Sequence, residues 1–456
     1  MPMKTKQVLS LLRAYESRNI VFVERDGSWP IVWERARDMY VWDANGKRYL
    51  DLTAAFGVAA AGHANPRVVK AGQRQLARLP HAMGDVHPHL RKAELARELS
   101  RLTFERWDNF RRDELHESPK SNPPQKSGNR KARPSGKTIF SNSGFEAVES
   151  ALKTAMLATG KQSVIAFSGA YHGLGYGALN VTHRDFFRSP FHYQLREFGH
   201  FVQFPSKAGD LAAVEWSVRR LLRRERIGAI LVEPVQARGG INVPPKEFLP
   251  MLRRLCDEHG ALLILDEIYT GFGRTGKWFA CEHSGVVPDL ICLGKALTGG
   301  FPLSACVGRA DIMDAAWPES HGEAIHTSTF LGHPVGCAMA LAQIGEIDRL
   351  NLCKRSVELG TFLLGELSKI QSPKLKVEAR GLGLMAGVEI HSPDGKPAIE
   401  VVMRAIKQML RRGFILLPEG EHANVISFTP PLTITKAQLT KTVTTLAEVL
   451  AADGRR

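Results

Sequence analysis

Apolar and polar residues alternate between two periodicities in the middle of this chain. Ile227–Val232 and residues 261–265 are continuous apolar runs, of the kind found in parallel strands buried on both faces. Phe248–His259, which lies between them, has apolar residues at helical spacing. This strand–helix–strand rhythm predicts an α/β domain with a mainly parallel sheet.

Further strand and helix patterns flank these runs. Strands are predicted at residues 138–140, Ser163–Phe167 and Leu290–Leu293, and helices at residues 146–157 and Leu211–Arg224. The same α/β domain therefore continues on both sides of the central runs.

The two ends of the chain have a different pattern. Residues 39–51 alternate around an Asn-Gly pair at 45–46, which is typical of a hairpin, and the C-terminal third reads as helices with short strands. We expect residues 65–345 to form the large domain, and residues 1–64 and 346–456 to form a smaller α+β domain together.

Composition is ordinary for a globular protein except for its charge. The 456 residues are 44% hydrophobic and 23% charged, with a net charge of +15 and a pI near 9.6. A basic chain could bind nucleic acid or an anionic surface, but no nucleic-acid-binding motif is visible. Much of the excess lies in residues 108–137, which have several prolines and few apolar residues. We expect this segment to be an exposed, mobile insertion; the alternative is a basic arm for an acidic partner.

Other sequence features bear on location. No apolar run approaches the roughly 18 to 20 residues that span a bilayer, and the N-terminal residues lack a signal-peptide pattern. Six cysteines lie between Cys256 and Cys353 without a C-x-x-C pair. Free thiols in a reducing compartment are therefore favoured over disulfides or a zinc site, and we expect a cytoplasmic protein without a metal.

Two chemically distinctive residues follow successive predicted strands. Asp266 ends the 261–265 run, and Lys295 follows the next run 29 residues later. Ligands bind at the carboxyl ends of strands in open α/β sheets. A lysine there can form a Schiff base with pyridoxal phosphate, and an aspartate can keep that cofactor's ring nitrogen protonated. Singly, the lysine would be a solvated surface charge and the aspartate a turn cap.

Two motifs near the middle of the chain suit a phosphate and a flat ring. Small residues at 141–146 open a helix, where backbone N–H groups favour an anion; a plain N-cap by Asn142 or Ser143 explains them about as well. Tyr171 follows the next strand, where an aromatic ring can stack on a cofactor or simply pack at the surface.

Two later motifs offer polar contacts. In Glu233-Pro234-Val235-Gln236, the glutamine can donate to a phenolate oxygen, although a proline-marked turn is an equal alternative. In residues 326–334, Thr329 can donate to a phosphate oxygen or can cap the following helix.

Together these motifs resemble the class III pyridoxal-phosphate aminotransferases, which have the type I aminotransferase fold. The resemblance is most specific from Leu265-Asp266-Glu267 through Gly271-Phe272-Gly273-Arg274-Thr275-Gly276 to Gly294-Lys295. It covers nearly all of the chain from Arg18 onward, outside residues 108–137. It implies an enzyme that takes an amino group from an amine or amino acid donor and passes it to a 2-oxo acid in a ping-pong reaction.

The resemblance also implies a role for each motif residue. Lys295 would form the Schiff base and shuttle the proton, and Asp266 would pair with the ring nitrogen; these two are the expected catalytic residues. Tyr171 and Val235 would pack on the two faces of the cofactor ring, and Gln236 would contact its phenolic oxygen. Thr329 would reach the phosphate bound by the neighbouring subunit, so a homodimer or larger assembly is implied. The expected cofactor contacts are Ser143, Gly144, Phe145, Tyr171, His172, Glu233, Val235, Gln236, Asp266, Lys295 and Thr329.

Three departures from the family pattern concern the substrate. Enzymes similar to 4-aminobutyrate aminotransferase carry an arginine at the position of Leu174 and a glutamate at the position of Arg238. They and the acetylornithine aminotransferases carry an arginine three residues before the position of Pro430, where this chain has Ser427. A narrow 4-aminobutyrate assignment is therefore not supported. We hypothesise that Arg238 binds the carboxylate of a 2-oxo acid; the alternative is an exposed arginine. The expected substrate contacts are Phe56 and Arg238.

These observations predict an ω-amine or ω-amino acid transaminase with a 2-oxo acid acceptor such as pyruvate. An aminomutase, an epimerase or a decarboxylating transaminase would share the same cofactor residues and stays open as an alternative. A nucleic-acid-binding or surface-binding protein that uses residues 108–137 is the alternative from a different class.

Overall fold

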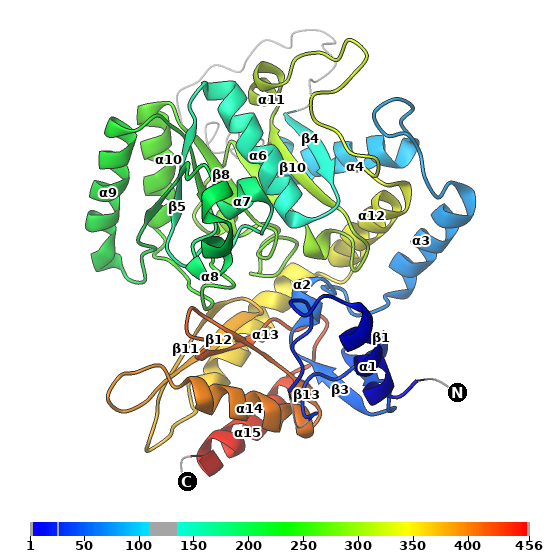
Figure 1. The fold of residues 1–456 in the computed structure, drawn as a ribbon, viewed down its shortest axis with the longest axis vertical. Helices are drawn as coiled ribbons and strands as arrows, with labels where there is room; N and C mark the ends of the chain where they lie inside the picture. Colours follow the sequence, from blue (N-terminus) through cyan, green and yellow to red (C-terminus); the bar gives the residue numbers. More distant parts are fainter. Residues whose placement is uncertain (1–2, 25–26, 109–134, 454–456) are drawn as a thin grey trace, which may run out of the picture.

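The core of the protein is a seven-stranded sheet, seen in the upper half of Figure 1. The computed structural model describes residues 3–24, 27–108 and 135–453. The strand order is β4 (Gly136–Ser141), β10 (Ser304–Arg309), β9 (Leu290–Leu293), β8 (Leu262–Asp266), β7 (Ile227–Val232), β5 (Ser163–Phe167) and β6 (Gly199–Val202). Only the pairings of β10 are antiparallel among these described strands, which confirms the expected mainly parallel sheet.

Alternate residues of the central strands point to opposite faces of the sheet. Ala229 and Leu231 pack in the cluster that contains α6 (Gly144–Thr159), whereas Ile230 and Val232 pack in the cluster that contains α10 (Phe248–His259). Burial on both faces explains why β7 is a continuous apolar run. Helices cover both faces, as the α/β prediction requires.

The predicted helix before β5 is longer than its apolar pattern. Helix α6 begins at Gly144 because a capping box between Ser143 and Glu146 satisfies its first backbone groups. It ends at Thr159 and is followed by Gly160, whose φ of 64° is the left-handed conformation that glycine adopts readily. The predicted strand Ser163–Phe167 and helices Leu211–Arg224 (α9) and Phe248–His259 have the bounds that their patterns indicate.

The remaining helices surround these elements. They are α1 (Thr5–Tyr15), α2 (Ala54–Gly57), α3 (Pro66–Arg78), α4 (Leu90–Ser100), α7 (Tyr176–Leu179), α8 (Asp185–Arg188), α11 (Ala310–Ala316), α12 (Pro334–Arg349), α13 (Leu352–Leu367), α14 (Ile399–Arg411) and α15 (Lys436–Asp453), with 3-10 or π turns η1 (Arg101–Glu105), η2 (Ser189–Gln194), η3 (Ala208–Asp210), η4 (Ala280–His283) and η5 (Lys295–Leu297).

Both ends of the chain meet in the lower half of Figure 1. One sheet joins β1 (Trp33–Arg37), β2 (Tyr40–Asp43) and β3 (Arg48–Asp51) to β13 (Phe414–Ile415). A second contains β11 (Lys376–Leu382), β12 (Met385–His391), β15 (Val425–Phe428) and β14 (Leu417–Glu419). The β3–β13 pairing confirms that the two ends build one smaller α+β unit. The division expected at 345/346 falls inside α12, because that helix continues to Arg349.

Most of the expected insertion at 108–137 lies outside the described residues, and its last two residues, Gly136 and Lys137, begin β4. All six cysteines are free thiols. In the described part of the chain, no helix has the length and apolar character needed to cross a bilayer. The same part contains no cluster of three residues able to ligate a metal.

Candidate active site

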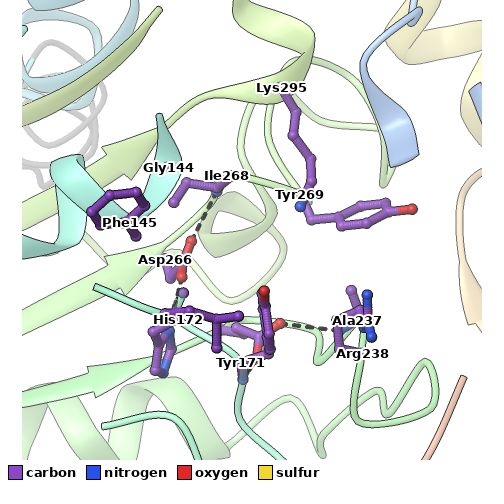
Figure 2. A pocket seen from close by; sticks show the side chains of 13 residues that line it. Gly144, Phe145, Tyr171, His172, Ala237, Arg238, Asp266, Ile268, Tyr269 and Lys295 are labelled. Carbon is purple, nitrogen blue, oxygen red and sulfur yellow. Dashed lines mark hydrogen bonds and ion pairs between the residues drawn. The ribbon is translucent and has the colours of Figure 1, made fainter. Parts of the chain in front are cut away.

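A cavity of ≈ 380 Å³ lies at the carboxyl-terminal edge of the large sheet (Figure 2). Parallel strands end at this edge, so the residues that follow β5, β7, β8 and β9 converge there. Asp266 and Lys295 both line the cavity, together with Tyr171, His172 and Glu233. Residues separated by more than a hundred positions in the sequence thus form one site.

Asp266 is the last residue of β8 and is held in place from two sides. Its Oδ2 lies 2.8 Å from His172 Nδ1, and its Oδ1 accepts a hydrogen bond of 3.1 Å from the Ile268 N–H. Since a carboxylate can only accept, His172 carries its hydrogen on Nδ1. The buried His172 Nε2 has no hydrogen-bond partner among the described residues. This arrangement orients the Asp266 carboxyl group, which lines the cavity.

Lys295 directly follows β9 and Gly294, in a strained backbone conformation with a φ of 41°. Burial lowers the pKa of Lys295 to about 8, against the opposing charges of Asp266 and Glu233. At pH 7 about a tenth of the amine is then uncharged, far more than for an ordinary lysine, and the uncharged form is what a nucleophile or base requires. Its Nζ lies 3.9 Å from the centroid of the Tyr269 ring.

Glu233 organises the loops beside the lysine. Its carboxylate accepts hydrogen bonds of 3.1 Å from the Tyr171 and Ala237 N–H groups. Burial raises the pKa of Glu233 to about 7. Glu233 therefore ties the loop after β5 to the loop after β7 and fixes where the Tyr171 ring stands.

The N-terminus of α6 borders the cavity. Gly144 and Phe145 line it, and the N–H groups of the first helical residues have no partner within the helix. A Cβ at Gly173 would lie 2.3 Å from Phe145 Cβ, so only glycine permits this close approach of the two loops. The result is a concave, N–H-lined site suited to an anion.

A cation and an anion meet at the other side of the cavity. Arg238 Nε lies 3.2 Å from Glu419 Oε2, and the Arg238 guanidinium also faces the Tyr171 ring at 5.1 Å. Glu419 is buried, and burial raises its pKa, opposed by Arg238 and Arg184. Among the described residues, the buried Arg238 Nε makes no hydrogen bond of good geometry, so the contact with Glu419 is an ion pair alone. Arg238 lines the cavity.

Two expected ring contacts lie outside this cavity. Val235 packs in an apolar cluster with Ile241 and Met385. Gln236 donates to the Ser168 carbonyl at 2.8 Å and accepts from the Asn242 amide at 3.1 Å, so both ends of its side chain are engaged. The structure places Ile268 and Tyr269 in the lining instead (Figure 2).

Three other expected residues do not line the cavity. Ser143 caps α6, and its hydroxyl bonds to Glu146 at 3.2 Å, in agreement with the N-cap alternative. Phe56 is 49% exposed and belongs to the left-handed turn α2. Thr329 is exposed in the single chain, so its expected contact with a second subunit stays a prediction.

Ile268, Tyr269 and Glu419 are site residues that sequence reasoning missed. The signal for the first two was their position directly after Asp266, which they follow into the cavity. The role of Glu419 could not be predicted from the sequence, because it lies 181 residues beyond Arg238 and the ion pair forms only when the small unit folds against the large one.

The residues present fit pyridoxal phosphate. An amine with a lowered pKa and an oriented carboxylate face one cavity, Ile268 and Tyr171 offer apolar and aromatic surfaces, and glycines open the helix N-terminus. A Cβ at Gly144 would lie 3.0 Å from Ile268 Cδ1, so a larger residue would narrow the space beside the helix.

Comparisons with known proteins agree with this site. Residues 22–450 match the family model described as aminotransferase class-III. The chain is 37% identical over 435 residues to the 5-aminovalerate aminotransferase DavT of Pseudomonas aeruginosa, covering 92% of this chain and 93% of that protein. It is 36% identical over 457 residues to a putrescine aminotransferase of Pectobacterium atrosepticum, covering 98% and 88%.

A solved structure has the same fold. The amine transaminase from an uncultivated Pseudomonas species, determined in its PLP-bound form, superposes with a TM-score of 0.80 at 28% identity and covers 96% of this chain and 98% of its own. The expected type I aminotransferase fold is thereby confirmed. Because the family model and these relatives each span most of its length, the chain belongs to the class-III aminotransferases, enzymes that transfer amino groups.

Proposed function

We propose that this protein is a pyridoxal-phosphate-dependent transaminase that moves an amino group from an ω-amino acid or amine to a 2-oxo acid such as pyruvate. The observation that carries the proposal is the convergence of Lys295 and Asp266 on one cavity, with the lysine's pKa lowered to about 8. The names of the relatives, a 5-aminovalerate and a putrescine aminotransferase, support a donor whose reacting amine is far from a carboxylate or lacks one.

When bound, pyridoxal phosphate would supply an electron sink for the electrons released at the substrate carbon. Lys295 would hold the cofactor covalently, and its free amine would move a proton at that carbon. Asp266, held by His172, would keep the ring nitrogen protonated by charge pairing. Tyr171 and Ile268 would pack on the ring, and Gly144 and Phe145 would offer N–H groups to the phosphate.

Arg238 would recognise the carboxylate of the 2-oxo acid. Arg238 Nε lies 3.2 Å from Glu419 Oε2. The guanidinium has further N–H donors, and these can bind the carboxylate of the substrate at the same time. An amine donor without a carboxylate would leave the Arg238–Glu419 pair intact. One cavity could then take two chemically different substrates in turn.

Thr329 would complete the phosphate site of a second subunit, so the active enzyme would be at least a homodimer. Its exposure in the single chain leaves the hydroxyl accessible to a neighbouring molecule. The free cysteines support a reducing, cytoplasmic location.

The test is a half-reaction experiment on the purified protein. Incubation with pyridoxal phosphate should give a stable visible absorbance band, and 5-aminovalerate or putrescine should bleach it. Pyruvate should then restore it and yield alanine. Lys295→Ala should retain the fold and lose the stable band. Two results would refute the proposal. The protein could take up no cofactor, or the absorbance band could persist with every amine tested and no amino acid be formed from pyruvate.

A further inference from the structure

The Tyr269 ring lies against the Lys295 amine. Nζ lies 3.9 Å from the ring centroid, within the range in which a cation is attracted to the electron-rich face of an aromatic ring. Figure 2 shows both side chains on the same side of the cavity, with Asp266 across from them. The lysine therefore rests against a ring and makes no direct ion pair with Asp266 or Glu233 among the described contacts.

The ring itself is held from two directions. The Tyr269 hydroxyl and Thr429 Oγ1 are 3.1 Å apart, and Thr429 Oγ1 donates to the Thr53 carbonyl at 3.2 Å. Because the Thr429 hydroxyl donates its hydrogen to that carbonyl, the Tyr269 hydroxyl must be the donor in its contact with Thr429. Burial raises the pKa of Tyr269 to about 12, so it stays a phenol. A Cβ at Gly57 would lie 2.9 Å from Tyr269 Cε1, which shows that α2 closes against the ring.

Opposing charges surround Lys295 at longer range. Asp266 at the end of β8, Glu233 after β7, and Glu419 on β14 favour its ammonium form, whereas Arg238 and burial disfavour it. His172 faces Asp266, and its Nδ1–H partly satisfies that carboxylate. The Tyr269 ring, by contrast, is in direct contact with the amine and favours its protonated form.

We propose that Tyr269 is a positioning residue that stabilises the protonated form of Lys295 through its ring face and holds the amine on one side of the cavity. Packing of α2 against the buried ring keeps that face turned toward Nζ, and the hydroxyl contact with Thr429 is an additional tie that the ring face does not need. Without the ring, a buried ammonium would lose its nearest stabilising surface, and Lys295 would be uncharged at lower pH. The consequence for catalysis rests on the proposed function of Lys295, but the effect on the amine does not.

The test measures the amine directly in the full-length protein stripped of cofactor. Carbamylation of Lys295 by cyanate, followed by peptide mass spectrometry, reports the uncharged fraction at each pH. Tyr269→Phe keeps the ring face and removes the hydroxyl. Replacing Tyr269 by 3,4,5-trifluorophenylalanine keeps the size of phenylalanine and removes most of the face's negative potential. Both variants fill the site, and melting curves verify that they fold.

The expected midpoint for Tyr269→Phe stays within about 0.3 unit of the wild type. The trifluorinated variant should shift the pKa of Lys295 down by about one unit, which raises labelling below the midpoint about tenfold. The same fluorinated residue in place of Tyr171, whose ring faces Arg238, should leave the midpoint unchanged. Equal midpoints for the two Tyr269 variants, or a full shift already in Tyr269→Phe, would overturn the proposal. Because neither cofactor nor substrate is present, this outcome is independent of the transaminase test.

Discussion

Arg238 and Glu419 allow a quantitative test of how the acceptor is recognised. Hydrogen bonds to charged groups contribute about 1.5–3 kcal/mol, and each 1.4 kcal/mol is a factor of ten in affinity. If Arg238 binds the carboxylate of pyruvate, Arg238→Gln should raise the KM for pyruvate by about 10-fold to 150-fold, with a smaller change in kcat.

The single variant carries a complication that the structure identifies. Glu419 is only 5% exposed, and removal of Arg238 leaves its buried carboxylate beside the cavity without its ion-pair partner. An uncompensated anion would repel pyruvate even if Arg238 never touched it. Glu419→Gln and the double variant Arg238→Gln/Glu419→Gln separate the two effects.

Steady-state kinetics with pyruvate at a saturating concentration of amine provide the assay. Glu419→Gln alone should lower the KM for pyruvate modestly, because the guanidinium is no longer shared. The double variant should still have a KM at least about tenfold above that of Glu419→Gln. Equal KM values for these two would refute direct recognition by Arg238. The bleaching of the cofactor by an amine without a carboxylate serves as the control and should change little.

Three further predictions concern stability and the cofactor site. Burial lowers the pKa of Lys295 from 10.5 to about 8, so folding is disfavoured while the free amine is charged. Lys295→Met should therefore stabilise the cofactor-free protein by about 1–3 kcal/mol below pH 8, and calorimetry should show this gain shrinking as pH rises from 8 toward 10.5. Ala55 has a φ of 50°, in the left-handed region. Ala55→Gly should raise the free energy of unfolding in urea melts by about 0.5–1 kcal/mol, because the relief of backbone strain exceeds the added entropy of the unfolded chain. A loss of stability would show that the turn is unstrained. Gly173→Ala would put a Cβ 2.3 Å from Phe145 Cβ, and titration with pyridoxal phosphate should show at least about tenfold weaker binding, while unaltered affinity would place the phosphate elsewhere.

The fold was largely readable from local patterns. Apolar runs such as Ile227–Val232 predict strands directly, because residues buried on both faces leave no polar position in the run. The smaller unit was less defined, since β13 has only two residues and pairs with β3 across more than 360 positions. Such a pairing depends on where the large domain places the chain ends.

The site was predicted unevenly for a similar reason. Asp266 and Lys295 directly follow strands, so the parallel sheet alone brings them to one edge. Val235 and Ile268 both follow neighbouring strands, and each is an apolar residue two positions after a glutamate or an aspartate. Sequence reasoning chose Val235, which packs in a cluster with Ile241 and Met385, whereas Ile268 is the residue that lines the cavity.

By itself, the sequence determined the main strands and helices of the central α/β stretch, the family resemblance, and the lysine and aspartate at the strand ends, because these depend on local periodicity and on motifs that are contiguous in the chain. Only the tertiary structure decided the Arg238–Glu419 pair, the contact of Tyr269 with Lys295, and the lowered pKa of that lysine. Each of these depends on burial and on side chains brought together from distant segments, and neither property is defined until the two ends of the chain pack against the large sheet.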